Sequence, residues 1–194
     1  MVRVRAAFLL AFALAVGRVP GLPGGRAAAQ TPPPASRTLV DAAVRQAGAE
    51  HKVVLVVFGA SWCGWCRRFH DMLADSGVGP ILAAHYVAVN LTAQESPAKR
   101  ALENPGSDSL MAALGGAKGG LPFFAALDSA GARIADSNLM PGGGNVGFPS
   151  EPDEVAAFDR FLANTAPRIT AAERERVRAY LDRIAGREAS GPSQ

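Results

Sequence analysis

The sequence predicts an α/β fold, because segments with the pattern of buried strands alternate with segments that have helical periodicity. The 194 residues, 48% of them hydrophobic, are enough for one well-buried core and too few for two. We therefore expect a single domain with tails. Strand-like apolar runs occupy residues 53–58, 85–91 and 123–127.

The first helix and the first strand follow a Pro-rich linker at residues 30–37. The helix is expected at residues 38–50, where Leu39 and Ala43 recur at helical spacing. Residues 53–58 are apolar and rich in β-branched side chains. We expect them to form a central strand that is covered on both faces.

The middle of the chain is expected to contain a helix at 63–74, a strand at 85–91 and a short helix at 107–114. The strand at 123–127 precedes the turn sequence Asp128-Ser129-Ala130-Gly131. Such a turn returns the chain to a short partner strand at 133–135, so a β-hairpin is expected.

Two helices are expected after the hairpin. We expect Ser150 to cap the first of them and Pro152 to lie in its first turn. The second, at residues 170–187, is highly charged. Its narrow apolar stripe consists of Val177, Tyr180, Leu181 and Ile184.

The excess positive charge lies in residues 1–29. These hold four of the 20 basic residues and no acidic residue, which leaves 16 basic against 17 acidic residues elsewhere. Arg3 and Arg5 precede the apolar stretch 6–16, and Ala27-Ala28-Ala29 offers small residues for cleavage. This is the pattern of a secretion signal, so we expect residues 1–29 to be a signal peptide.

We expect the signal to be removed before Gln30, and Ala15-Val16-Gly17 is a possible earlier site. The apolar stretch is shorter than the roughly 20 residues that a spanning helix needs. An uncleaved anchor is the alternative, but we expect membrane contact only during export. A periplasmic or secreted protein lies where disulfides persist.

Cys63 and Cys66 are the two cysteines of the chain, in the sequence Trp62-Cys63-Gly64-Trp65-Cys66. If Cys63 opens a helix, Cys66 lies almost one turn later on the same side, so the sulfurs can form a disulfide. A structural disulfide that encloses so short a loop would stabilise little. A c-type haem site would need His where Arg67 stands. A partial zinc set with His70 has no convincing fourth ligand.

Three features in order resemble the thioredoxin family. Val54 to Cys66 is similar to the family's strand that enters a Trp-Cys-x-x-Cys site, and Leu121-Pro122 falls where the family has its cis-proline. A closing helix lies at residues 150–163. The resemblance covers residues 38–165 and implies a thioredoxin fold, a central mixed sheet flanked by helices. Residues 166–194 would add a C-terminal helix and a polar tail.

The start of a helix favours an anion, so we expect Cys63 to form the thiolate and to attack. We expect Cys66, which should be more buried, to resolve the mixed disulfide. The resemblance implies a substrate face that includes Trp62, Trp65, Leu121 and Pro122. The backbone of Leu121 would pair with substrate as an added strand. Simple core packing is the alternative for Trp62, and an ordinary trans proline is the alternative for Pro122.

The chain departs from the family at Val57, which stands where thioredoxins often hold a buried acid. No obvious base therefore serves Cys66. Arg67 and Arg68 either favour the Cys63 thiolate or form a solvated helix face. No catalytic role is assigned to His51, His70 or His85.

Two glycine-rich stretches follow later in the chain. Residues 115–120 lack the spacing of a phosphate-binding loop and are expected to be a mobile loop. Residues 141–149 make the connection to the next helix longer than the minimal fold requires. We expect them to border the substrate face, with a passive connector as the alternative.

We therefore expect an exported thiol-disulfide oxidoreductase that reduces or isomerises protein disulfides through Cys63 and Cys66, without a metal or organic cofactor. The alternative is a noncatalytic binding module of the same fold, in which the dithiol is a redox switch or a weak metal clamp. Its partners would be exported protein disulfides or thiols and a redox donor or acceptor that recycles the pair. We expect a monomer that does not bind nucleic acid.

Overall fold

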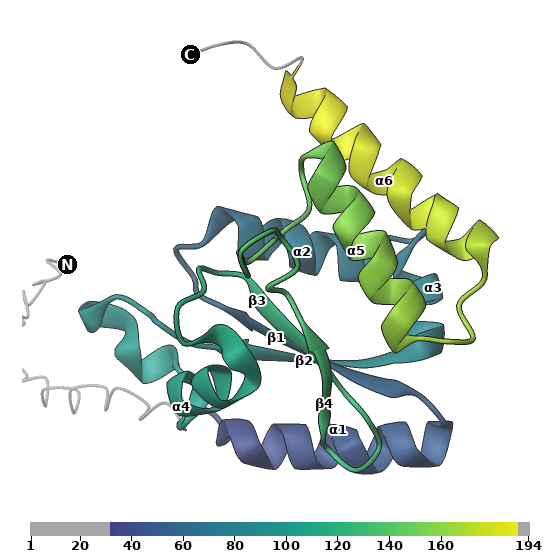
Figure 1. Cartoon of the computed structure of the whole chain (residues 1–194). Helices are drawn as coiled ribbons and strands as arrows, with labels where there is room; N and C mark the ends of the chain where they lie inside the picture. Colours follow the sequence, from purple (N-terminus) through teal and green to yellow (C-terminus); the bar gives the residue numbers. More distant parts are fainter. Residues whose placement is uncertain (1–31, 190–194) are drawn as a thin grey trace, which may run out of the picture. The chain divides into compact units, whose positions relative to one another are not determined.

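A mixed sheet of four strands, in the order β2-β1-β3-β4, forms the centre of the structure (Figure 1). The strands are β1 (Val53–Gly59), β2 (Tyr86–Thr92), β3 (Phe123–Leu127) and β4 (Arg133–Asp136). β1 is parallel to β2 and antiparallel to β3, and β3 pairs with β4 as the predicted hairpin. This computed structural model describes residues 32–189, so the predicted signal peptide lies outside the described residues.

Helices lie on both faces of this sheet. α1 (Ser36–Glu50) covers one face, and the other face carries α2 (Gly64–Ala74), α3 (Gly79–His85), α5 (Pro152–Thr165) and α6 (Ala171–Ala189) (Figure 1). The link from β2 to β3 contains three short helices, η1 (Pro97–Leu102), α4 (Ser107–Met111) and η2 (Ala112–Gly116). The mixed sheet flanked by helices that the sequence predicted is thus confirmed. In residues 32–189 no helix has both the length and the apolar character needed to cross a membrane.

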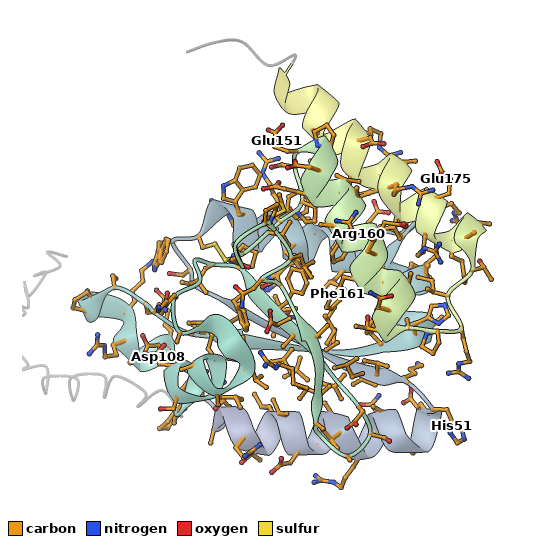
Figure 2. All side chains as sticks on the ribbon, viewed as in Figure 1. His51, Asp108, Glu151, Arg160, Phe161 and Glu175 are labelled. Carbon is orange, nitrogen blue, oxygen red and sulfur yellow. A yellow bond between two sulfur atoms is a disulfide. The ribbon has the colours of Figure 1, made fainter. Side chains whose placement is uncertain are left out.

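β1 is buried on both faces, as predicted. Val54, Val56 and Phe58 belong to the core cluster beneath α1, whereas Leu55 and Val57 belong to the cluster beneath α2 and α5. The alternation follows from the strand's two-residue period. Side chains fill the space between the sheet and the helices on each of its two faces (Figure 2).

Aromatic rings form the centre of the second cluster. Phe124 of β3 contacts rings from α2 and α5, and the centroid distances within this group run from 5.0 to 6.3 Å. The other members are Phe69, Phe158 and Phe161. The group fixes α2, and therefore the cysteine pair at its start, against the sheet.

The sequence analysis did not predict α3, which is only seven residues long and too short to show a periodic pattern. A Cβ at Gly79 would lie 2.6 Å from the carbonyl oxygen of Leu73, so α3 can approach α2 this closely only with glycine there. Since α3 ends at His85, β2 begins at Tyr86 rather than at the predicted His85.

Two further predictions need correction. The N-cap of α5 is Glu151, not Ser150, because the helix begins at Pro152 and the residue before it has an extended backbone. The Glu154 carboxylate reaches back and accepts hydrogen bonds from the backbone N–H groups of Glu151 and Ser150, at 3.1 and 2.9 Å. Residues 115–120 are not wholly loop, because η2, which follows α4, reaches Gly116, although the backbone kinks at Gly115, where φ is 103°.

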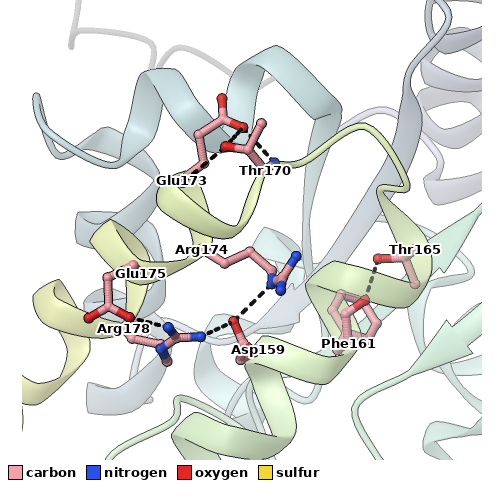
Figure 3. Close-up of polar contacts among 8 residues, drawn as sticks. All are labelled: Asp159, Phe161, Thr165, Thr170, Glu173, Arg174, Glu175 and Arg178. Atoms are coloured by element: carbon pink, nitrogen blue, oxygen red, sulfur yellow. Dashed lines mark hydrogen bonds and ion pairs between the residues drawn. The ribbon is translucent and has the colours of Figure 1, made fainter.

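The charged C-terminal helix α6 docks on α5. Three residues of its predicted apolar stripe, Val177, Tyr180 and Leu181, are buried in the main core cluster. Polar contacts reinforce the junction, because Asp159 of α5 accepts from Arg174 at 3.1 Å and pairs with Arg178 at 2.8 Å (Figure 3).

A cap fixes the start of α6. The Thr170 backbone N–H and hydroxyl both donate to the Glu173 carboxylate at 2.8 Å (Figure 3). These hydrogen bonds hold the pKa of Glu173 below its usual value. α6 therefore has a defined beginning as well as a buried stripe.

We predict that Leu181→Ala lowers the free energy of unfolding by about 2–5 kcal/mol, because Leu181 is 1% exposed and its loss leaves a cavity beneath α6. Urea unfolding followed by circular dichroism measures this change. The matched control is Leu102→Ala, which removes a leucine that is 45% exposed and should cost no more than about 0.5 kcal/mol. Equal effects of the two substitutions would contradict the docking of α6.

Candidate active site

The cysteine pair lies where β1 ends and α2 begins. Cys63 has an extended backbone and is the N-cap of α2, and Cys66 is the third residue of the helix. Their sulfurs form a disulfide, with the Cα atoms 5.3 Å apart. The backbone N–H of Cys66 points at the Cys63 Sγ, at 3.0 Å. The predicted position of Cys63 at the start of a helix is confirmed.

This geometry favours negative charge on Cys63 once the pair is reduced. The first N–H groups of a helix have no intrahelical acceptors, and the helix dipole adds partial positive charge at the same end. Cys63 Sγ already accepts one of these N–H groups. The arrangement therefore favours a thiolate at Cys63 over one at Cys66.

Burial does not distinguish the two cysteines. Cys63 is 3% exposed and Cys66 is 2% exposed, so the expected greater burial of Cys66 is not seen. Both pack against Ala60 and the partly buried Leu121 in a small apolar cluster. What separates the two sulfurs is their position relative to the helix start.

Arg67 and Arg68 contact the site. The Arg67 guanidinium donates to the carbonyl oxygen of Ser61 at 3.3 Å, and the Arg68 guanidinium carbon lies 5.1 Å from the centre of a Trp65 ring. The Arg68 contact has cation–π geometry. These residues place two positive charges in the first turns of α2.

Leu121 packs against the cysteines, and its peptide bond to Pro122 is cis. The cis bond that the resemblance implied is therefore present. The Asn145 side-chain amide holds this loop, because its Nδ2 donates to the carbonyl oxygens of Gly120 at 2.8 Å and of Pro122 at 3.0 Å. Asn145 was not singled out in the sequence, where a lone Asn in a glycine-rich stretch gives no signal.

Trp62 and Trp65 flank the disulfide and are exposed. Trp62 is 57% exposed, which excludes core packing, and its indole N–H donates to the carbonyl oxygen of Gln94 at 2.8 Å. Trp65 is 43% exposed and stacks on Phe148, with ring centroids 6.0 Å apart. Both indoles present apolar surface next to the sulfurs.

A groove of about 780 Å³ begins at Trp65. The cis-proline loop forms one wall, and residues 143–148 of the second glycine-rich stretch form another. The stretch thus lies next to Leu121 and Pro122, and its place at a substrate face stays a prediction. Its contribution of Phe148 was not predicted, because the aromatic partner of Trp65 lies far away in the sequence.

On the opposite side of the cysteine pair lies Glu95, another residue that the sequence analysis did not single out. Val57 is fully buried where the family often has an acid, but Glu95 is 5% exposed and its carboxylate holds Ser61 of the site loop. A hollow of about 430 Å³ is lined by Cys66, Glu95 and His70, among others. Glu95 follows β2, and only the parallel pairing of β2 with β1 brings it here.

The histidines lie in different places. His51 ends α1 and is exposed (Figure 2), whereas His85 ends α3 and lies 3.5 Å from Glu173. His70 is exposed and borders the hollow beside Cys66. Among residues 32–189 no group of three or more His, Cys, Asp or Glu side chains could hold a metal ion.

One family model and several solved structures are similar to this chain. Residues 36–129 match the family model described as thioredoxin-like. A disulphide isomerase from Xylella fastidiosa Temecula1 is similar at 18% identity, with a TM-score of 0.46 and coverage of 83% of this chain and 95% of that chain. A DsbH oxidoreductase is similar at 22% identity, with a TM-score of 0.40 and coverage of 78% and 96%. No curated protein matches.

The family match spans β1, the cysteine pair, β2 and β3, and so contains the first two of the three features that resembled the family, whereas the closing helix α5 lies outside it. The remaining strand, β4, and α5 complete a mixed sheet with helices on both faces. Residues 36–129, which carry Cys63 and Cys66, therefore match the thioredoxin-like family, and the chain has the thioredoxin fold with an additional C-terminal helix.

Proposed function

We propose that this protein is a thiol-disulfide oxidoreductase that uses Cys63 and Cys66 to exchange disulfides with other proteins. The observation that carries this proposal is the bonded pair at the start of α2, with the Cys66 N–H directed at Cys63 Sγ. A sulfur held this way is a stable anion and a good nucleophile, and its partner is already within bonding distance.

The reduced pair would act in two steps. The Cys63 thiolate attacks one sulfur of a substrate disulfide, a mixed disulfide forms, and the other substrate sulfur leaves as a thiolate. Cys66 then loses its proton and attacks Cys63 Sγ, which forms the Cys63–Cys66 disulfide and releases the second substrate thiolate. Two electrons pass to the substrate, and an external dithiol returns them. In the opposite direction the oxidised pair accepts two electrons from substrate thiols.

The groove beside the pair supports a peptide substrate. An extended segment could pair with the backbone at Leu121 while an apolar side chain lies on Trp65 and Phe148. Arg67 and Arg68 add positive charge to this edge, so a segment without basic residues near its cysteine is favoured.

We also propose that the protein acts after export, in the periplasm or outside the cell. Residues 1–29 have the order of charged, apolar and small residues found in secretion signals. Disulfides persist in such compartments, so both substrates and an oxidised Cys63–Cys66 pair would be present there.

A noncatalytic binding module is the second candidate, and the burial of both sulfurs favours it. The two cysteine residues are 3% and 2% exposed, so they offer a partner little surface. The pH dependence of Cys63 alkylation separates the two functions. An enzyme should be alkylated rapidly well below pH 8, whereas a switch should behave as an ordinary thiol with a pKa of about 8.5.

We predict that reduced Cys66→Ala accumulates a mixed disulfide between Cys63 and insulin when it is mixed with disulfide-bonded insulin, because the resolving thiol is gone. Nonreducing gels and mass spectrometry detect the adduct. Cys63→Ala is the matched control and should form little adduct, since the remaining thiol lacks the helix-start position. Equal trapping by both variants would contradict the assignment of Cys63 as nucleophile.

We predict that Trp65→Ala raises the KM for a peptide disulfide by about 2- to 10-fold, because it removes the stacked surface that Trp65 forms with Phe148. The exchange rate with dithiothreitol, which is too small to reach Phe148, should change less. Kinetics with the two substrates measure the difference. An equal loss with both would assign Trp65 to the redox chemistry rather than to peptide binding.

A further inference from the structure

One charged side chain lies in the interior next to the cysteine pair. Glu95, in the segment after β2, is the only charged residue among the buried polar side chains of residues 32–185. A buried carboxylate is tolerated where hydrogen bonds replace its lost water. The exchange steps proposed above do not use Glu95, so its burial has another cause.

The partner of Glu95 is Ser61, two residues before Cys63. The Ser61 backbone N–H donates to Glu95 Oε1 at 2.5 Å, and the Ser61 hydroxyl donates to Oε2 at 3.0 Å. The Ser61 hydroxyl oxygen also accepts from Lys99 Nζ at 3.2 Å, and its carbonyl accepts from Arg67 at 3.3 Å. Every polar atom of Ser61 is therefore engaged, and a buried anion and two cations meet on one residue.

The segment around Glu95 holds the same loop at two more points. The Ala93 N–H donates to the Gly59 carbonyl at 2.8 Å, and the Trp62 indole N–H donates to the Gln94 carbonyl at 2.8 Å. We call residues 93–95 the clamp. The Glu103 carboxylate in turn accepts from the Glu95 backbone N–H at 2.8 Å, so the clamp is itself anchored.

Any shift of the clamped loop reaches Cys66 directly. A Cβ at Gly59 would lie 3.1 Å from Cys66 Cβ and 3.3 Å from its Sγ, so the loop backbone rests against this side chain with no room between them. Cys63 stands two residues beyond Ser61 on the same loop. The clamp thus affects the positions of both sulfurs: that of Cys63 through the chain, and that of Cys66 through packing against Gly59.

From these contacts we propose that Glu95 is a positioning residue of the dithiol, which fixes Ser61 and so holds Cys63 in line for attack by Cys66. The proposal rests on the exchange function proposed above. The helix holds Cys66, whereas the loop before it sets where Cys63 Sγ lies. Small misplacements of reacting atoms slow a reaction strongly, so the clamp should speed the second, intramolecular step most.

The test uses the full mature chain and oxidised glutathione as the probe, with rapid quenching and mass spectrometry to follow the mixed disulfide on Cys63. Glu95→Ala should slow its resolution by Cys66 at least about tenfold while slowing its formation less. It should also raise amide hydrogen exchange at Ser61. Glu95→Gln keeps an acceptor for the N–H and offers a donor to the hydroxyl oxygen, so its resolution rate should stay within about threefold of the unaltered protein.

Asp41→Asn is the charge control, because Asp41 is exposed on α1, on the opposite face of the sheet. It should change neither rate. If Glu95→Ala does not fold, Ser61→Ala takes its place; it loses the hydroxyl contacts with Glu95 and Lys99 but keeps the backbone N–H bond to Glu95, so it should slow resolution by a smaller factor. The proposal is overturned if Ser61 exchange and the resolution rate are unchanged in these variants. It is also overturned if Glu95→Gln is as slow as Glu95→Ala with an altered pH profile, which would make Glu95 a proton acceptor.

The proposed function fails separately. If the unaltered protein resolves glutathione adducts but does not act on protein disulfides, the proposed function is wrong. The comparison of Glu95 variants still decides the role of the clamp.

Discussion

The hydrogen bond from the Cys66 N–H to Cys63 Sγ connects the chemistry of this protein to its architecture. It exists because the chain leaves a central strand and enters a helix within a few residues, so that a sulfur occupies the N-cap position. The aromatic cluster under α2 keeps that helix in place, and the sheet keeps the strand in place. Without either, the sulfur would lose the donor that favours its ionised form.

The sequence identified the parts of the fold that have strong local patterns. β1 was predicted because it is apolar and β-branched over its whole length, and the hairpin because of the turn at Asp128 to Gly131. α3 is too short for a periodic pattern, and its start depends on the contact between Gly79 and Leu73. The N-cap of α5 lies one residue later than predicted, at Glu151, whose backbone N–H donates to the Glu154 carboxylate.

The residues of the site likewise fall into those that a local pattern predicts and those that it does not. Cys63, Cys66, Leu121 and Pro122 could be placed from the motif and its order in the chain. Glu95 could not, because its role comes from the pairing of β2 beside β1 and from a contact 34 residues away. Phe148 and Asn145 likewise act through contacts between distant segments, which leave no trace in local spacing.

The Asn145 side chain joins the glycine-rich stretch to the cis-proline loop but touches neither sulfur. The glycine-rich wall that a partner would meet is therefore a separate piece of backbone from the pair that would exchange electrons. Relatives with shorter or longer stretches at this point could choose different partners while keeping the same sulfur reactivity. In such a scaffold, selectivity and redox strength can evolve independently.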